Sequence, residues 1–555
     1  MKVRKRAGTR RNSAVAAIKT PLVQSAGILS YVILLIMRIP LSKVIGDAGV
    51  GLFAPAFEIF MLVTFITSYG MTGAISGMIR YRVKREQHGN AKRVFVAVFI
   101  MDILISIVFA AMIVFMSSKI AELGILESLS RMAVPVAAPS IIFAAVIGTF
   151  RGFFNGYGLG TLTAHSQYIE KISMLFCALG CGSTLYAYGT KVSALRQNTE
   201  FSFAHGAMGA MLGVLLSQVI TAIYLLVIYL LYARTLRSKI MTESGKWGES
   251  QYTIQRTALL NCLPTAIVAV FTNVFMLIDQ RMFNYCMNKR VEELGEIRTA
   301  TWGVYYGKFS VLIGAGAALC LLCVAMMTGK IKNAYDKEDY RVMRERLDKA
   351  VCKLSIAAFP TAVYLAALAE AVAKCLYKNE TVAVGSWIQK GAVIIVLCSF
   401  SFFFAQLLFR MHMLRELFIS ILAALIVHVF VAWLFVQKAL LGVDGIIYAL
   451  IAYFAVFCVM NFLSVSRNLK YQPNWLSGVA FPAAAAVVSG LAVMLIARFM
   501  LEPAGAAATI LTGIVAGVFL DLTMLMILRV IGEEELSRIP LGFFFIMFGK
   551  NIGVL

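Results

Sequence analysis

Apolar stretches recur along the whole 555-residue chain and are separated by short polar connectors. Most of them reach the ~20 residues that an α-helix needs to cross the ~30 Å hydrocarbon core of a bilayer. Because backbone polar groups must be satisfied internally in lipid, the pattern predicts membrane-spanning helices. We expect an all-α polytopic membrane protein with about fourteen transmembrane helices, near residues 22–44, 54–79, 93–117, 132–153, 166–188, 206–232, 256–285, 300–328, 349–375, 388–409, 413–437, 443–465, 475–498 and 504–530.

The composition supports this prediction and leaves no room for a separate soluble domain. Hydrophobic residues make up 60% of the chain and charged residues 14%, with a mean hydropathy of +0.82. The basic start, MKVRKRAGTRRN, resembles that of a signal peptide, but the following apolar run is too long and lacks a small-residue cleavage site. We therefore expect a retained first helix. The ten cysteines lie almost entirely in apolar stretches, so they indicate packing rather than metal binding, including the pair Cys320 and Cys323.

Positive charge concentrates in alternate connectors, and this sets the expected orientation. The net charge is +23, and the connectors at 80–92, 233–255 and 329–348 are rich in Lys and Arg. An opposite connector, with Lys289, Arg290, Glu292 and Glu293, is mixed in sign. The positive-inside rule then makes both termini cytoplasmic, namely the N-terminus at 1–21 and the tail at 531–555. This places the charge beside anionic inner-leaflet lipids, on the order of 1 kcal/mol for each cation, and argues against nucleic acid as a partner.

An internal similarity indicates two halves. The segment GLFAPAF (Gly51 to Phe57) is similar to GVYYGKF (Gly303 to Phe309), an offset of 303 − 51 = 252. Asn155 and Gln406 lie in similar aromatic surroundings at an offset of 406 − 155 = 251. The shared offset predicts pseudo-symmetric six-helix lobes at 22–232 and 256–465, joined by the cytoplasmic loop 233–255 and followed by two further helices at 466–530. Transporters built from such repeats bind substrate at the repeat interface.

Several segments resemble the multidrug/oligosaccharidyl-lipid/polysaccharide exporter superfamily, particularly its lipid II flippases and stage V sporulation B-type members. They are RIPLSKVIGDAGVGLF (38–53), FRGFFNG (150–156), SQYIEKI (166–172) and LAEAVAKCLY (368–377). The segment after Gln406, LLFRMHMLREL, departs from the glycine-rich basic turn of the family. The resemblance extends over the full chain and implies a flippase that moves undecaprenyl-diphosphate-linked glycan precursors, such as lipid II, from the inner to the outer leaflet by alternating access. It also implies a bacterial cell membrane and a role in peptidoglycan or polysaccharide biosynthesis.

Ionisable residues within spans are the candidate substrate ligands, because charges at membrane depth are costly and usually face a cavity or a partner. Arg38, Glu58, Asp279, Arg281 and Lys308 all lie near the expected outer ends of spans one, two, seven and eight. In the resembled family these helices line the central cavity. A mixed, net-cationic layer suits a diphosphate head group. Snorkelling of Arg38 and Lys308 to water is the alternative.

Spacing and charge suggest how these groups divide. Asp279 and Arg281 are two residues apart, so they point about 200° apart on a helix. We expect Arg281 to face the cavity and Asp279 to pair with a neighbouring helix. We expect Glu58 to be the counter-charge of Arg38, and Arg38→Ala to abolish transport while leaving folding near wild type.

A second group of residues indicates structure more than substrate binding. Arg151 lies at the expected cytoplasmic end of span four, where a helix C-terminus favours a cation and lipid phosphates are near. Gly152, Gly156 and Gly158 suit close backbone approach and a tight exit from the helix. Together with Asn155 and Gln406 these positions match the family motifs. Glu170 and Glu370 suggest packing or capping carboxylates, and Asp102, His428 and Asp521 favour hydrogen-bonded structural roles over ion coupling.

No nucleotide-binding, metal or nucleophile motif is present in the sequence, so we expect a transporter rather than an enzyme, with no cofactor. Energy would come from a Na⁺ or H⁺ gradient, the membrane potential or the lipid gradient. A drug or organic-cation antiporter of the same superfamily is the alternative function and would require unpaired carboxylates in an apolar pocket. A membrane enzyme would need large outer loops bearing carboxylates or histidines, and the outer loops are short.

A polyprenyl tail is too long to be enclosed, which predicts a lateral opening for the apolar chain. Small residues at Gly49, Gly51, Gly303 and Gly307 would let the helices of such a gate part and close. The opening should lie between spans one and eight or between spans two and seven. We expect the protein to act as a monomer on a polyprenyl-diphosphate-linked glycan.

Overall fold

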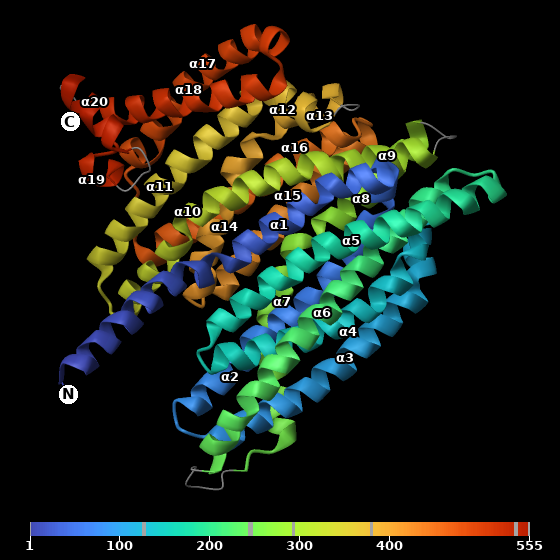
Figure 1. Cartoon of the computed structure of the whole chain (residues 1–555). Coiled ribbons are helices and arrows are strands. Elements are labelled where there is room, and N and C mark those ends of the chain that lie inside the picture. Colours follow the sequence, from blue (N-terminus) through green and yellow to red (C-terminus); the bar gives the residue numbers. More distant parts are fainter. Residues whose placement is uncertain are drawn as a thin grey trace. The chain divides into compact units, whose positions relative to one another are not determined.

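The computed structural model describes residues 2–124, 129–241, 248–290, 295–377, 381–537 and 542–552, with side chains from Ser25 onward except a few within helices. These residues are almost entirely helical, and none of them forms a β-strand (Figure 1). The helices are α1 Lys2–Thr64, α2 Met71–Val83, α3 His88–Glu122, α4 Val134–Gly156, α5 Gly160–Arg196, α6 Glu200–Met241, α7 Gln251–Asn273, α8 Phe275–Arg290, α9 Gly295–Val304, α10 Ser310–Asp336, α11 Tyr340–Ala367, α12 Ala369–Leu376, α13 Thr381–Gly391, α14 Val393–Arg410, α15 Leu414–Ala432, α16 Val443–Leu469, α17 Phe481–Ala504, α18 Ala506–Ile527, α19 Glu533–Leu536 and α20 Gly542–Ile552.

Short irregular helical segments join some of these helices. The π-helical ones are η1 Phe65–Gly70, η3 Tyr305–Phe309, η4 Trp433–Lys438 and η5 Leu476–Ala480, and η2 Leu129–Met132 is a 3₁₀ helix. Single-turn π segments often mark functional sites, because the extra residue locally re-aims side chains. Two of them, η1 and η3, lie close to the residues described below.

Thirteen helical segments of the described chain are long and apolar enough to cross a membrane. The first, Ser25–Val83, is 59 residues long and is broken at Gly46, whose φ of 75° and ψ of 164° are not helical. Arg38 and Glu58 are 58 − 38 = 20 residues apart, ~30 Å in a straight helix, yet their side chains form an ion pair at 3.5 Å. The chain therefore doubles back at Gly46, and this segment holds two of the expected spans. The prediction of an all-α polytopic membrane protein is confirmed.

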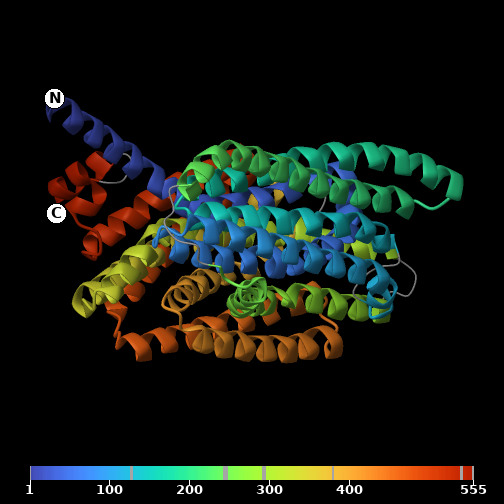
Figure 2. The same cartoon turned by 90° about the horizontal axis from the view of Figure 1, so that it is seen from below.

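The helices gather into two compact units, of which the first comprises Met1–Lys308 and Ala432–Val443. Helices α5 and α6 pack along each other, and α4 lies against α2, α3 and α6 (Figures 1 and 2). Aromatic rings fill the space between α3, α4 and α6: Phe95 lies 5.0 Å from Phe153 and 5.1 Å from Tyr229 between ring centroids. These contacts make the first unit a close-packed bundle.

Three glycines on one face of α4 bring it against η1 and α2. A Cβ atom at Gly148 would lie 2.6 Å from Ser68 Cα, one at Gly152 would lie 2.8 Å from Ile75 Cβ, and one at Gly156 would lie 2.6 Å from Ile79 Cβ. Small residues at every fourth position allow such close helix approach in membranes. The expected tight exit from α4 is confirmed at Gly158, whose φ of 78° is in the left-handed region.

The second unit comprises Phe309–Val431 and Asp444–Leu555. Its helices α17 and α18 pack against α11, where Tyr364 hydroxyl donates to Ser489 Oγ at 2.9 Å. The two units do not part at the expected loop 233–255, of which residues 242–247 lie outside the described residues, because residues 256–308 belong to the first unit. The six-plus-six arrangement of spans stays a prediction.

Candidate functional site

A charged cluster lies where the two arms of α1 meet η3, all within the first unit. It consists of Arg38 before the break at Gly46, Asp47 and Glu58 after it, and Tyr306 and Lys308 on η3. Arg38 is 5% exposed and Lys308 is 6% exposed, so both cations are buried among apolar helices. Burying charges costs several kcal/mol for each ion unless partners compensate, and here each cation has one.

Arg38 is held by two neighbours. Its guanidinium lies 3.5 Å from Glu58 Oε1 and stacks 3.7 Å from the centroid of the Tyr306 ring. The Tyr306 hydroxyl donates a hydrogen bond of 2.6 Å to the same Glu58 oxygen. The prediction that Glu58 is the counter-charge of Arg38 is therefore confirmed, and the aromatic partner was not expected.

Lys308 donates to Asp47 Oδ2 at 2.6 Å, and this carboxylate was not among the predicted site residues. Asp47 directly follows Gly46 in the segment RIPLSKVIGDAGVGLF, where an aspartate suggests a turn or helix start rather than a buried ion pair. Its pairing with Lys308 could not be predicted without knowledge of which helices pack together. The four charges of this cluster balance, whereas the net-cationic layer predicted from Arg38, Glu58, Asp279, Arg281 and Lys308 stays a prediction.

The burial of the cluster also argues against our expectation that Arg38→Ala folds near wild type. Removing one partner of a buried ion pair leaves the other charge uncompensated, which typically costs about 3–5 kcal/mol. Loss of transport by this single variant would therefore not separate substrate binding from folding.

Asp279 and Arg281 lie on α8 and point to different sides, as their spacing predicts. Asp279 is fully buried, whereas Arg281 is exposed. Arg281 is thus not part of the charged cluster described above. Its proposed contact with substrate stays a prediction.

Two glycines form a backbone-to-backbone contact between α1 and α9, which we call the glycine contact. A Cβ atom at Gly51 would lie 1.9 Å from the Thr299 carbonyl oxygen, and one at Gly303 would lie 1.8 Å from the Asp47 carbonyl oxygen. No side chain larger than hydrogen fits at either place. These are the first residues of the two similar segments detected in the sequence.

The glycine contact is reciprocal. Gly51 approaches Thr299 and Gly303 approaches Asp47, and the matched positions share one offset, 303 − 51 = 252 and 299 − 47 = 252. Two copies of a segment related by a two-fold axis make contacts of this kind, in which each copy offers the same pair of positions to the other. The contact thus supports the internal repeat.

The other two predicted gate glycines lie near this contact. A Cβ atom at Gly307 would lie 3.1 Å from Val50 Cγ1 and 3.9 Å from the Arg38 carbonyl oxygen. At Gly49 the nearest atom is Ile45 Cγ1 of the same hairpin, at 3.0 Å. Small residues therefore let α1, α9 and η3 approach closely, while their opening as a gate stays a prediction.

Arg151 belongs to a second polar group, inside the bundle of the first unit. Its Nε donates to Ser166 Oγ at 2.8 Å, and its guanidinium pairs with Glu170 Oε2 at 2.7 Å. Lys171 and Gln218 also donate to Glu170. Arg151 is buried and its ion pair joins α4 to α5, in line with the structural roles expected of Arg151 and Glu170.

The remaining family positions lie outside the charged cluster. Asn155 Oδ1 accepts from Thr163 Oγ1 at 2.9 Å. Glu370, in the first turn of α12, is exposed and pairs with Lys374 at 2.7 Å. Gln406 is half-buried on α14.

Asp102 on α3 differs from our expectation. It is fully buried, and neither carboxyl oxygen has a hydrogen-bond partner among the described residues. The Cys262 thiol of α7 lies in its neighbourhood. The hydrogen-bonded structural role predicted for Asp102 is therefore wrong. Within the described part of the chain, no three His, Cys, Asp or Glu side chains gather as metal ligands.

Comparison with known proteins gives one family and one fold. Residues 20–314 match the polysaccharide biosynthesis protein family. Stage V sporulation protein B of Bacillus subtilis (strain 168) is 20% identical over 532 residues, covering 94% of this chain and 97% of the relative.

Solved structures agree with this result at the level of the fold. The lipid II flippase MurJ in an inward closed conformation superposes with a TM-score of 0.60 at 14% identity, covering 91% of this chain and 97% of that one. An inward-facing multidrug resistance MATE family transporter of the MOP superfamily gives 0.56 at 17% identity, covering 80% and 94%.

Proposed function

Because the chain belongs to the polysaccharide biosynthesis protein family, we propose that it is a flippase that moves a polyprenyl-diphosphate-linked glycan precursor from the inner to the outer leaflet. The relatives named above are a lipid II flippase, a multidrug transporter and a sporulation protein. The setting that fits is the plasma membrane of a bacterium, with both termini in the cytoplasm.

One observation carries the proposal: two buried cations, Arg38 and Lys308, are held beside a contact between repeated segments. Arg and Lys are the side chains that pair with diphosphate oxygens. Their present partners, Glu58 and Asp47, would compensate their charges in an apolar surrounding until substrate arrives. The diphosphate would then exchange with the carboxylates, and release of the head group would restore the ion pairs.

The glycine contact is where the proposed flippase would open and close. Alternating access requires that helices at a repeat interface separate and rejoin, and backbone-to-backbone contacts rejoin without rearranging side chains. We propose that this contact is the closed lateral gate, through which the apolar tail stays in lipid while the head crosses. The driving force would be a Na⁺ or H⁺ gradient or the membrane potential.

A double variant tests the role of the cations. Arg38→Gln/Glu58→Gln replaces the ion pair by two neutral amides, so it leaves no uncompensated buried charge. We expect folded protein that no longer flips a lipid-linked glycan in liposomes. The matched control is Lys374→Gln/Glu370→Gln, which removes an exposed ion pair and should flip at the wild-type rate. Wild-type flipping by the first variant would refute the proposal.

A crosslink tests the gate. Val50→Cys/Gly307→Cys joins α1 to η3, because a Cβ atom at Gly307 would lie 3.9 Å from Val50 Cβ, within the range of disulfides. Oxidation should stop flipping, and reductant should restore it. The control pair Gly385→Cys/Ala373→Cys joins α13 to α12, where a Cβ atom at Gly385 would lie 3.9 Å from Ala373 Cβ, and should have no effect because neither helix belongs to the gate. Unchanged flipping with the first pair fully crosslinked would rule out this gate.

The drug or organic-cation antiporter remains the second candidate, and Asp102 is the observation that favours it. An unpartnered buried carboxyl is the kind of group that such an antiporter requires for proton or cation exchange. Native mass spectrometry of gently purified protein separates the two functions. A co-purified polyprenyl diphosphate would support the flippase, and proton-driven uptake of organic cations by liposomes without it would support the antiporter.

A further inference from the structure

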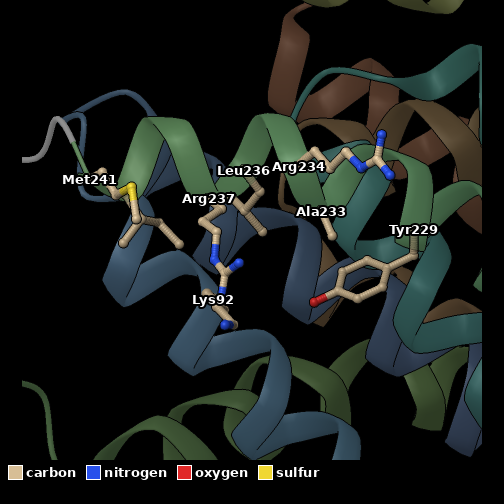
Figure 3. Close-up of a pocket in the computed structure, with 8 residues that line it drawn as sticks. Lys92, Tyr229, Ala233, Arg234, Leu236, Arg237 and Met241 are labelled. Atoms are coloured by element: carbon tan, nitrogen blue, oxygen red, sulfur yellow. The ribbon is translucent and has the colours of Figure 1, made fainter.

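A basic pocket lies between the first turns of α3 and the last turns of α6, away from the charged cluster. Its volume is about 490 Å³, and its eight lining residues are Lys92, Tyr229, Ala233, Arg234, Leu236, Arg237, Ile240 and Met241 (Figure 3). Three of them are cations and none is acidic. Nearby, the tilted rings of Phe95 and Tyr229 pack α3 against α6.

Two of the three cations point to one place in the pocket. Figure 3 shows the guanidinium of Arg237 and the ammonium of Lys92 pointing toward one another, with the Tyr229 hydroxyl directed to the same space and Arg234 turned away. Two like charges facing each other repel, and an anion between them would turn this repulsion into attraction. A phosphate accepts hydrogen bonds from all three groups.

Apolar surface leads directly to both cations. On α3, the exposed side chains of Val96, Ile100 and Leu104 follow Lys92 at steps of four residues. On α6, the exposed Leu226 and Leu230 precede Arg237 along the same helix face, with Ala233 between them. Residues three or four apart share one face of a helix, so each cation ends a continuous apolar stripe.

We propose that the basic pocket binds the phosphate of an anionic phospholipid whose acyl chains lie along these two stripes. A soluble anion would have no use for the stripes, whereas a phospholipid needs both a charged head site and an apolar path. Both cations belong to segments that the charge distribution assigns to the cytoplasmic side, so the lipid would come from the inner leaflet. It would join α3 to α6 and stabilise the first unit.

Native mass spectrometry with phosphatidylglycerol and phosphatidylcholine tests this proposal. We expect the wild-type protein to retain phosphatidylglycerol in preference to phosphatidylcholine. Lys92→Gln/Arg237→Gln should lower phosphatidylglycerol retention about tenfold or more, since each cation near a membrane surface contributes about 1 kcal/mol. Thermal unfolding in lipid-free detergent should not occur at a lower temperature than in the wild type, because both side chains are exposed and their mutual repulsion is removed.

The matched control is Lys119→Gln/Arg196→Gln, which removes two exposed cations from the opposite end of α3 and from the end of α5. It should retain phosphatidylglycerol like the wild type. Equal retention by the pocket variant and the wild type would overturn the proposal. So would displacement of the lipid by excess inorganic phosphate, which would make the pocket a site for free anions. Flipping is not the readout, so this test is independent of the proposed function.

Discussion

Arg38 and Glu58 form a pair in which each residue accounts for the burial of the other. Arg38 lies under the Tyr306 ring and is nearly inaccessible, and the side chain of Glu58 is 14% exposed. Such a pair adds little net stability over apolar side chains, yet breaking it is costly. The pair therefore keeps two charges available inside the protein and adds little to its stability.

The cost of breaking the pair and the cost of removing both residues can be compared in detergent. We expect Arg38→Ala to lower the free energy of unfolding by about 3–5 kcal/mol, because Glu58 stays buried without its partner. Arg38→Ala/Glu58→Ala should recover a large part of that loss. Denaturant titration followed by circular dichroism reads both values. An additive double variant, as unstable as the sum of the single ones, would show that the two charges are not coupled.

Asp102 is the other residue whose burial is not explained by its contacts. A buried carboxyl without a hydrogen-bond partner is costly, so it is retained at a price in stability. We expect Asp102→Asn, which has the same shape, to leave the unfolding midpoint near wild type and to abolish any dependence of transport on an ion gradient. Asp521→Asn in α18 is the control. Gradient-dependent transport by Asp102→Asn would assign this residue a structural role.

At the level of helices, the glycine contact sets how closely α1 and α9 approach. Gly51→Ala and Gly303→Ala should each prevent accumulation of folded protein, because the new Cβ would meet a backbone carbonyl rather than a side chain that can move. Gly73→Ala in α2 is the control, since a Cβ there meets nothing within 4 Å. Fluorescence-detected size exclusion compares the three. A monodisperse Gly303→Ala peak of normal height would contradict the stated geometry.

The sequence predicted the helices well and their partners less well. Span positions follow from hydropathy, which is a property of each segment alone. Asp47 with Lys308, Tyr306 with Arg38 and Arg151 with Glu170 depend on which helices pack together, which single-sequence periodicity does not contain. The pairing of Arg38 with Glu58 could be predicted because both charges were placed at one depth in neighbouring spans.

The whole molecule carries its charge in a way that fixes a testable topology. We expect the loops at 80–92, 233–255 and 329–348 to face the cytoplasm, since Lys and Arg residues concentrate in these connectors. Lys84→Cys and Arg344→Cys are suitable reporters because both positions are exposed. An impermeant thiol reagent should label them only after the membrane is opened. Labelling in intact cells would show that these loops face outward and that the predicted orientation is wrong.

The break at Gly46 also bears on how the nascent chain enters the bilayer. The first span carries Arg38, and an arginine within a span costs up to about 2.5–3.5 kcal/mol on insertion scales, the value at the helix centre. Its partner Glu58 is synthesised about 20 residues later, which takes roughly 1–4 s at the usual rate of translation. Until then the translocon holds a helix with an unpaired charge.

Insertion of the first span should therefore depend on the residues downstream of it. In a glycosylation-reporter assay, a chain truncated between Gly46 and Glu58 should insert poorly, and a chain extended past Glu58 should insert well. Glu58→Gln in the longer chain should reduce insertion again. The first two spans would then enter lipid as one preassembled hairpin. Glu58, which pairs with Arg38 in the folded protein, would thus already act during synthesis and membrane insertion.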